Sequence, residues 1–365
     1  MNARTPDDAA SRSLIGRDRG ALRQLLATLD VARAQLSMRA AQLFRWIYGR
    51  GARDFGEMSD LPAKLRAALS THFALDRPEV LAEQRSADGT IKWLLRLHDG
   101  QRIETVFIPE ADRGTLCVSS QVGCALSCTF CRTGTMPLVR NLGASEILGQ
   151  ILLAKDRLED WPADRPERRL TNLVFMGMGE PLFNYAELRR ALAVVLDRSG
   201  LGLSRRRVTV STAGVVPGID ALGRDLGVRL AVSLHAPDDA LRSELVPLNR
   251  KWNIDAVLAA CRRYPARRQI TFEYVMLDGV NDTPDHARAL AARLRDLPAK
   301  VNLIPFNPWP GSPFRCSPPQ RIRAFRELLE QAGIEAPIRT PRGRDIMGAC
   351  GQLAIDGLRR RRRAA

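Results

Sequence analysis

The stretch Gly123–Gly134, which reads GCALSCTFCRTG, decides how the rest of the chain is interpreted. Within it Cys124, Cys128 and Cys131 follow a C-x3-C-x2-C spacing, and the aromatic Phe130 lies beside the third thiol. Clustered thiolates bind either a tetrahedral zinc ion or an iron–sulfur cluster, and a purely structural site of either kind normally has four protein ligands. A cluster held by three cysteines leaves one iron open for a substrate or cofactor. The count of three therefore predicts a reactive site, with a zinc knuckle as the structural alternative.

The composition is that of a globular protein. The chain has 365 residues, of which 45% are hydrophobic and 26% are charged, so we expect one large domain or a large domain with a small one. The opening MNARTPDDAASRS resembles no secretory signal, and no apolar run approaches the roughly 20 residues of a membrane span. Seven cysteines, three of them in one loop, favour metal and thiol chemistry in a reducing compartment. We therefore expect a cytoplasmic protein that makes no membrane contact.

The charge balance favours a polyanionic partner. With 56 Lys and Arg against 40 Asp and Glu, the net charge is +16, and neutralising phosphates would release counterions. A genome rich in arginine codons would produce the same surplus. Near the end of the chain, Arg359–Arg363 form a block of like charges that stays unfolded unless it meets an anion. This block could contact RNA, or it could be a solvated end without a role, and the sequence favours neither alternative.

Strand-like and helix-like segments alternate after Thr115. We expect strands near 115–119, 171–176, 207–211, 228–234, 269–276 and 300–305. We expect helices near 145–158, 185–198, 217–226, 238–263, 284–296 and 319–332. Six such units predict an α/β fold whose parallel sheet curves into a partial TIM-like (β/α)6 barrel.

The other segments complete the predicted organisation. A β-hairpin is expected from the alternating runs Ile91–Leu97 and Arg102–Ile108, which join at Asp99-Gly100, and Glu104 lies on its second strand. The predicted divisions are 1–20 disordered, 21–90 a helical accessory domain for RNA, 91–112 the hairpin, 113–345 the barrel core and 346–365 a C-terminal loop and tail.

Small and polar residues follow the predicted strands, at the edge where such folds carry their sites. The cysteine loop follows the first strand, and Gly177–Pro181, reading GMGEP, follows the second. Later strands end at Ser211, Ser233–His235 and Asn307. This pattern predicts a polar rim suited to a polar cofactor.

The cysteine loop resembles the signature of the radical S-adenosylmethionine (SAM) enzymes. That resemblance implies a [4Fe–4S] cluster whose open iron binds SAM and whose electron splits it to a 5′-deoxyadenosyl radical. The GMGEP segment resembles the family's glycine-rich contact with the SAM amino group, where glycines permit close approach and a carboxylate accepts from an ammonium. The implied SAM-binding residues are Gly179, Glu180, Ser211, Ser233, Leu234, His235 and Asn307. Without the resemblance, a core histidine is the alternative interpretation of His235.

Further motifs resemble one group within that superfamily, the RlmN group of RNA methyltransferases. They are SSQVGC at Ser119–Cys124, RNL at Arg140–Leu142, FNPWPG at Phe306–Gly311, and the isolated Cys117 and Cys350. The resemblance runs from about Trp93 to Leu353. It implies methylation of C2 of an adenine in 23S rRNA, at the peptidyl-transferase centre, and in tRNA next to the anticodon. It also implies a monomer that receives electrons from a flavodoxin or a ferredoxin-type protein.

The resemblance also implies three catalytic residues. One SAM methylates Cys350, and a second yields the radical that activates this methyl group for addition to C2. Glu104 then removes the C2 proton, and Cys117 attacks Cys350 to form a transient disulfide that releases the product. From the residues alone, Glu104 could be a surface charge and Cys117 a buried apolar thiol.

Two other functions stay open at this point. The related group that methylates C8 of the same ribosomal adenine shares the two-cysteine scheme. A non-catalytic, metal-stabilised RNA-binding protein would share the cysteine loop and the charge. Cys261 and Cys316 match no role, and we expect both to be structural.

Overall fold

The computed structural model describes residues 12–265 and 270–355, and its centre is a nine-stranded sheet in the order β1-β2-β3-β4-β7-β8-β9-β10-β11. The last six strands of that order pair in parallel. They are β4 (Arg113–Cys117), β7 (Asn172–Phe175), β8 (Val208–Thr212), β9 (Arg229–Ser233), β10 (Ile270–Met276) and β11 (Ala299–Pro305). Each corresponds to one of the six expected strands, so the predicted α/β core of six parallel units is confirmed.

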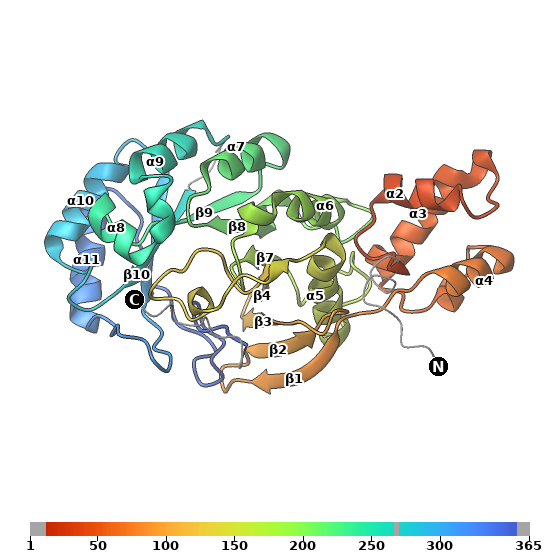
Figure 1. The fold of residues 1–365 in the computed structure, drawn as a ribbon, viewed down its shortest axis with the longest axis horizontal. Helices are drawn as coiled ribbons and strands as arrows, with labels where there is room; N and C mark the ends of the chain where they lie inside the picture. The colour runs from red at the N-terminus through yellow and green to blue at the C-terminus, as the bar shows by residue number, and fades with distance from the viewer. Residues whose placement is uncertain (1–11, 266–269, 356–365) are drawn as a thin grey trace.

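Helices follow the parallel strands and lie around the outside of the sheet (Figure 1). They are α5 (Ala144–Arg157), α6 (Tyr185–Leu196), α7 (Val216–Asp225), α8 (Asp239–Leu245), α9 (Ile254–Arg263), α10 (Pro284–Leu294) and α11 (Pro319–Gln331). The single helix expected at 238–263 is wrong, because a 3-10 turn (Pro247–Arg250) separates α8 from α9. Asn253 then begins α9 by accepting the backbone N–H of Ala256, which caps the new helix.

The antiparallel side of the sheet contains the predicted hairpin and one strand that we did not expect. The hairpin strands are β2 (Ile91–Arg96) and β3 (Arg102–Glu110), and β3 continues antiparallel into β4. Ahead of them, β1 (Glu79–Arg85) pairs with β2 as an edge strand. No side chain of β1 is buried, so the strand lacks the hydrophobic alternation that reveals a strand in a sequence.

A helical unit precedes the sheet and projects from the core (Figure 1). It consists of α2 (Arg19–Leu26), α3 (Leu36–Phe44) and α4 (Ala63–His72), with a π-helical turn at Arg45–Arg50 and 3-10 turns at Arg33–Gln35 and Phe55–Glu57. The prediction that residues 1–20 are disordered is wrong for residues 12–20, which the structure describes. Leu14 is fully buried, and its N–H donates to the Ala74 carbonyl at 3.0 Å. Residues 1–11 and the arginine block Arg359–Arg363 lie outside the described residues.

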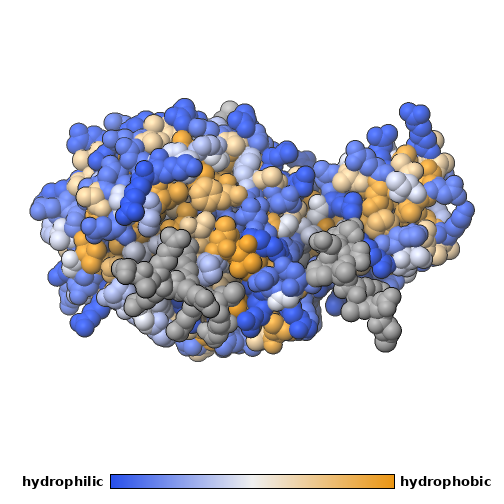
Figure 2. Space-filling view, in the orientation of Figure 1, coloured by the Kyte–Doolittle hydropathy of each residue, from blue (hydrophilic) through white to orange (hydrophobic). Residues whose placement is uncertain are grey.

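The surface of the protein is mostly hydrophilic, as expected from the composition of a globular protein. Figure 2 shows hydrophilic residues over most of the visible face, with hydrophobic residues gathered over the N-terminal helices and near the middle of the core. The largest exposed apolar side chains include Leu138, Val139 and Phe183. Among the helices described, none is both long and apolar enough to cross a membrane.

Candidate active site

A cavity lies at the carboxyl ends of the parallel strands, where this class of fold places its sites. Its wall combines the cysteine loop with residues that end or follow β7, β8, β9 and β11. Ten sequence-predicted residues line it: Cys124, Cys128, Cys131, Gly179, Glu180, Ser211, Ser233, His235, Asn307 and Cys350. Segments that are far apart in the sequence thus converge on one space.

The cysteine loop is closed at its base by two short strands. β5 (Gln121–Val122) pairs antiparallel with β6 (Arg140–Asn141), so the loop leaves and returns at one place. Gly123 has a φ of +77°, and a Cβ there would lie 1.8 Å from the Pro137 carbonyl oxygen. A Cβ at Gly134 would lie 2.5 Å from the Cys128 carbonyl oxygen. Only glycine fits at these two positions, and they allow the loop to fold tightly on itself.

The electrostatics of the loop fit an iron–sulfur cluster. Burial and the neighbouring thiols of Cys131 and Cys124 raise the pKa of Cys128 well above its usual range. Three adjacent thiolates form together only when a positive centre balances them. Among the described residues, no three His, Cys, Asp or Glu side chains are grouped as a single metal ion requires. A [4Fe–4S] cluster takes one thiolate on each of three irons and leaves the fourth iron open, so the donor set fits this group.

Glu180 lies beneath the cavity with 1% of its surface exposed. Its carboxylate oxygens accept the backbone N–H groups of Leu182 at 3.0 Å and Ala213 at 2.8 Å. Burial nevertheless raises the pKa of Glu180 to about 7. A cationic group in the cavity would stabilise the ionised carboxylate, so this position suits the ammonium of an amino acid.

The glycines of the GMGEP segment pack against the protein. A Cβ at Gly177 would lie 2.7 Å from Ser119 Oγ, and one at Gly179 would lie 2.5 Å from Gln121 Cβ. Gly179 also has a φ of +97°. Both glycines line the cavity, and these contacts show that they also let the segment pack against the residues that lead into the cysteine loop.

His235 is held as a neutral ring. It is 4% exposed, and its Nδ1 accepts the backbone N–H of Val275 at 3.0 Å. Burial and the nearby Arg242 lower the pKa of His235 to about 3, so the ring carries its single proton on Nε2. Its ring stands edge-on to Phe130 with centroids 4.6 Å apart. His235 therefore joins the end of β9 to the cysteine loop.

Leu234 is the exception among the predicted SAM-binding residues. It does not line the cavity, because its side chain is fully buried in the core. Its N–H donates to the Glu273 carbonyl at 3.1 Å, and its carbonyl accepts Arg242 Nε at 3.0 Å. Ser211 and Ser233, which lie near the ends of the neighbouring strands β8 and β9, do line it.

Arg242 organises this rim and was not found from the sequence. It is fully buried, and its Nη2 donates to the carbonyls of Ala213 at 2.6 Å and Ser233 at 3.1 Å. Burial lowers its pKa to about 10, so it remains a cation at neutral pH. Nothing in the sequence separates this arginine from the solvated arginines of other helices.

Cys117 and Cys350 line one space. Cys117 ends β4 and lines a second cavity, whose wall shares Cys131 and Cys350 with the first. Burial and the proximity of Cys350 raise the pKa of Cys117 to about 12. Both cysteines are free thiols in this structure. Cys117 also packs in the hydrophobic core, as a buried apolar thiol would, and it lines the same cavity as Cys350.

Residues 347–354, which we call the Cys350 loop, are attached to the site by separate hydrogen bonds. Asn307 Nδ2 donates to the Cys350 carbonyl at 3.1 Å. From the cysteine loop, the Arg132 N–H donates to the Gly351 carbonyl at 2.8 Å, and Thr133 Oγ1 donates to Leu353 at 2.6 Å. The Cys350 loop is thus joined to the cysteine loop and to the end of β11.

Glu104 lies beneath the Cys350 loop and does not line either cavity. It is 6% exposed, it forms an ion pair with Lys92 at 3.0 Å, and it accepts the N–H of Ala354 at 2.9 Å. Burial raises the pKa of Glu104, and the charges of Lys92 and Arg132 oppose that rise. The interpretation of Glu104 as a surface charge is wrong.

Two more charged residues line both cavities and were not predicted. Glu273 Oε1 accepts from Asn302 Nδ2 at 3.0 Å, while its buried Oε2 has no hydrogen-bond partner. Electrostatic interactions with Cys350 and Glu273 raise the pKa of Arg339. Glu273 could have been recognised from the sequence, because it is a single carboxylate within the apolar strand ITFEYVM. No feature of the sequence marks Arg339 in this way.

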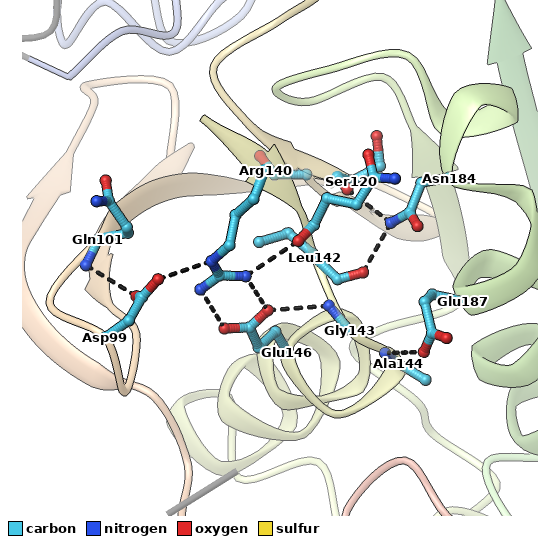
Figure 3. Close-up of polar contacts among 12 residues, drawn as sticks. Asp99, Gln101, Ser120, Arg140, Leu142, Gly143, Ala144, Glu146, Asn184 and Glu187 are labelled. Atoms are coloured by element: carbon cyan, nitrogen blue, oxygen red, sulfur yellow. Dashed lines mark hydrogen bonds and ion pairs between the residues drawn. The ribbon is translucent and has the colours of Figure 1, made fainter. Parts of the chain in front are cut away.

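The RNL motif secures the exit of the cysteine loop (Figure 3). Arg140 makes a bidentate pair with Glu146 at 2.8 Å and contacts Asp99 in the hairpin turn at 2.7 Å. Asn184 Nδ2 donates to the carbonyls of Ser120 at 2.9 Å and Leu142 at 2.7 Å. This motif ties the loop to α5 and to the hairpin, and therefore fixes the position of the cysteines.

A parallel α/β core whose strand ends carry a three-cysteine loop defines a radical SAM enzyme. Residues 118–290 match the Radical SAM superfamily, and residues 13–75 match the ribosomal RNA large subunit methyltransferase N-terminal domain. A solved radical SAM methyltransferase from Sphaerobacter thermophilus superimposes with a TM-score of 0.86 at 47% identity, over 93% of this chain and 98% of that one.

Curated relatives narrow the class. The dual-specificity RNA methyltransferase RlmN of Rhodopseudomonas palustris strain BisB5 is 58% identical over 94% of this chain and 89% of its own length. That of Bradyrhizobium diazoefficiens is 57% identical over 94% and 88%. The chain belongs to the RlmN family of radical SAM RNA methyltransferases, which use a [4Fe–4S] cluster and SAM.

Proposed function

We propose that this protein methylates C2 of an adenine in 23S rRNA and in tRNA, with Cys350 as the carrier of the methyl group. The observation that carries the proposal is the placement of Cys350 between two cavities, one with the cofactor residues and one with Cys117. Membership of the RlmN family argues against a non-catalytic RNA-binding protein. Aromatic C2 of adenine has no lone pair for ordinary methyl transfer, so the reaction needs a radical route.

The cofactors have a defined place in this proposal. Cys124, Cys128 and Cys131 hold the cluster, and Glu180, Ser211 and the other rim residues bind SAM. When bound, the cluster and SAM together supply the carbon-centred radical that activates the methyl group on Cys350. The rim residues orient SAM, and neutral His235 offers Nε2–H as a donor without adding positive charge near the sulfonium.

The remaining steps belong to residues of this chain. The RNA adduct on Cys350 is a radical, so it has to give up one electron, which the bound cluster would accept, and Glu104 accepts the proton from its C2. The Cys117 thiolate then attacks the Cys350 sulfur, the sulfur–carbon bond breaks with its electron pair on the methylene carbon, and that carbon takes a proton to become the methyl product. The charge of Arg339 opposes the rise in the pKa of Cys117 that burial and Cys350 cause, and it therefore helps the attacking thiolate to form. Two electrons from outside reduce the resulting disulfide.

The expected partners follow from the same proposal. The substrate is RNA, and a net charge of +16 predicts that binding weakens steeply with salt. A flavodoxin or a ferredoxin-type protein supplies electrons to a monomeric, cytoplasmic enzyme. The target adenine leaves its stack to reach the cavity.

The test is mass spectrometry of nucleosides from 23S rRNA and tRNA treated with the anaerobically reconstituted protein. We expect 2-methyladenosine in both RNAs. Formation of 8-methyladenosine alone would assign the chain to the related C8 reaction instead. Methylation that persists in Cys350→Ala would remove the thiol from the mechanism.

A further inference from the structure

Lys92 and Glu104 form a buried ion pair beneath the Cys350 loop. Lys92 lies opposite Val106 and Glu104 lies opposite Leu94, so the two side chains are diagonal neighbours on one face of the β2–β3 hairpin. Their side chains are 9% and 7% exposed, and Lys92 Nζ lies 3.0 Å from Glu104 Oε1. The cost of removing both charges from water roughly cancels their attraction, so such a pair contributes little net stability. The pair matters because each of its two side chains also contacts another part of the protein.

Each ion contacts one end of the Cys350 loop. Lys92 Nζ donates to the Met347 carbonyl at 3.3 Å. At the other end, the Ala354 N–H donates to Glu104 Oε2 at 2.9 Å. Cys350 lies between these two contacts. The ion pair therefore spans the base of the loop that carries the reactive thiol.

We propose that Lys92 is a positioning residue that keeps Glu104 ionised as the proton acceptor and holds the Cys350 loop over it. This inference rests on the proposed function, because it assigns a supporting residue to the proposed base. Lys92 contacts Glu104 and the loop backbone, and it acts on the reaction through them.

The electrostatics support this role. Burial raises the pKa of Glu104, and Lys92 makes the largest opposing contribution. The other groups that oppose the rise are the Ala354 N–H and the more distant charge of Arg132. Without Lys92, the pKa of Glu104 would rise further, and the protonated carboxyl, which cannot accept another proton, would be favoured more strongly.

Proton transfer would also change how the loop is held. When Glu104 takes the C2 proton, the electron pair of the carbon–hydrogen bond stays with the ring and Glu104 becomes neutral. The ion pair with Lys92 is then lost, and the hydrogen bond from the Ala354 N–H is no longer charge-assisted, which makes that bond about half as strong. The loop loosens at the stage at which the Cys350 sulfur has to reach Cys117.

The first measurement uses the cofactor-free protein and needs no reaction. We compare backbone hydrogen exchange over residues 347–354 in wild type, Lys92→Met, Lys92→Arg and Lys155→Met. Lys155 is the matched control, because it forms a buried ion pair with Asp160 at 2.7 Å elsewhere in the fold. We expect exchange in the loop to rise about tenfold in Lys92→Met, to rise less in Lys92→Arg and to stay unchanged in Lys155→Met. Equal protection in Lys92→Met and wild type would overturn the proposal.

The second measurement uses the assembled enzyme and an RNA with deuterium at C2 of the target adenine. In Lys92→Met we expect methylation to fall about 100-fold, in the range of a lost general base. The isotope effect should rise and the rate should recover at higher pH, because more Glu104 ionises there. Lys92→Arg should restore part of the rate. A slower Lys92→Met enzyme with the isotope effect and pH profile of wild type would indicate a structural role only and would contradict the proposal.

Two further outcomes are distinguishable. If wild type makes no 2-methyladenosine, the proposed function fails. The hydrogen-exchange measurement still tests whether the ion pair holds the Cys350 loop. If Lys92→Met does not fold, Lys92→Met combined with Glu104→Gln removes both charges and leaves no unpaired ion. Faster exchange over 347–354 in that double variant supports the proposal, and wild-type protection rejects it.

Discussion

The two sides of the candidate site are built differently. The first side, which we call the cofactor wall, comprises the cysteine loop and the strand-end residues such as Ser211 and Ser233, whose backbones belong to paired strands. The Cys350 loop lies in no strand of the described chain and is attached by single hydrogen bonds. A cofactor must stay in one place, whereas a thiol that forms and breaks bonds must change its distance from its partner. We therefore expect mutations to disable the two sides separately.

Cys128→Ala should have the largest effect, because it removes a ligand from the cofactor wall. We expect the anaerobically purified variant to lose its iron and sulfide and to show no detectable methylation, measured by metal analysis and nucleoside mass spectrometry. Cys261→Ala is the control, since Cys261 is 2% exposed on α9 and lies outside both cavities. Wild-type iron content in Cys128→Ala would show that the cluster lies elsewhere.

Cys350→Ala should separate the two sides. We expect methylation to fall by at least about 10³-fold, as when a nucleophile is removed, while iron and sulfide stay at wild-type levels. Cys316→Ala serves as the matched variant, because Cys316 is a half-buried thiol that lines neither cavity. If Cys350→Ala lost its iron as well, the loop would be part of the cofactor wall and the distinction would fail.

The cofactor wall was easier to predict from the sequence than the support of the Cys350 loop. The parallel strands are short runs rich in Val, Ile and Leu, and the residues after each run meet at one edge of any parallel sheet. By contrast, Lys92 is 255 positions from Met347, and Glu104 is 250 positions from Ala354. Their pairing depends on how the chain folds back, which periodicity does not encode.

Other differences also have local physical reasons. β1 was missed because none of its side chains is buried. Helices α8 and α9 were merged because their apolar periodicity continues across Pro247, and Asn253 was not taken as a cap. Arg242 and Arg339 were missed because a buried arginine and a solvated one look alike in a single sequence.

His235→Asn tests the neutral histidine of the cofactor wall. The folded pKa of about 3 lies below the unfolded value of about 6.5, so the folded protein binds fewer protons and loses stability as pH falls from 6.5 toward 3. Asn offers an acceptor to Val275 N–H and tolerates the φ of +63°, and it does not titrate. Relative to this variant, wild type should lose about 2 kcal/mol between pH 6.5 and pH 5, measured by urea unfolding of cofactor-free protein. A constant difference across this range would show that the ring is not buried as a neutral group.

The smallest expected effect comes from replacing two buried glutamines, one that supports the cofactor wall and one in the Cys350 loop. Gln150 is fully buried and joins α5 to Ser119, accepting its N–H at 2.9 Å and donating to its carbonyl at 3.0 Å. Gln352 is 2% exposed and joins the Cys350 loop to the cofactor wall, accepting from Ala349 N–H at 3.2 Å and donating to the Pro308 carbonyl at 2.8 Å. Replacement by Met keeps the volume and leaves the same kinds of backbone group without a partner.

Because Ser119 belongs to the core, Gln150→Met should lower the global free energy of unfolding by about 2 kcal/mol. Gln352→Met should leave global unfolding nearly unchanged and lower the free energy of local opening over 347–354 by about 1 kcal/mol, a roughly fivefold faster exchange. Urea unfolding and hydrogen exchange on both variants measure the two quantities. If Gln352→Met lowered global stability as much as Gln150→Met, the Cys350 loop would unfold only with the core. A loop coupled in that way could not move by itself during the reaction, so the exchange of Cys350 with Cys117 would require motion of the whole sheet.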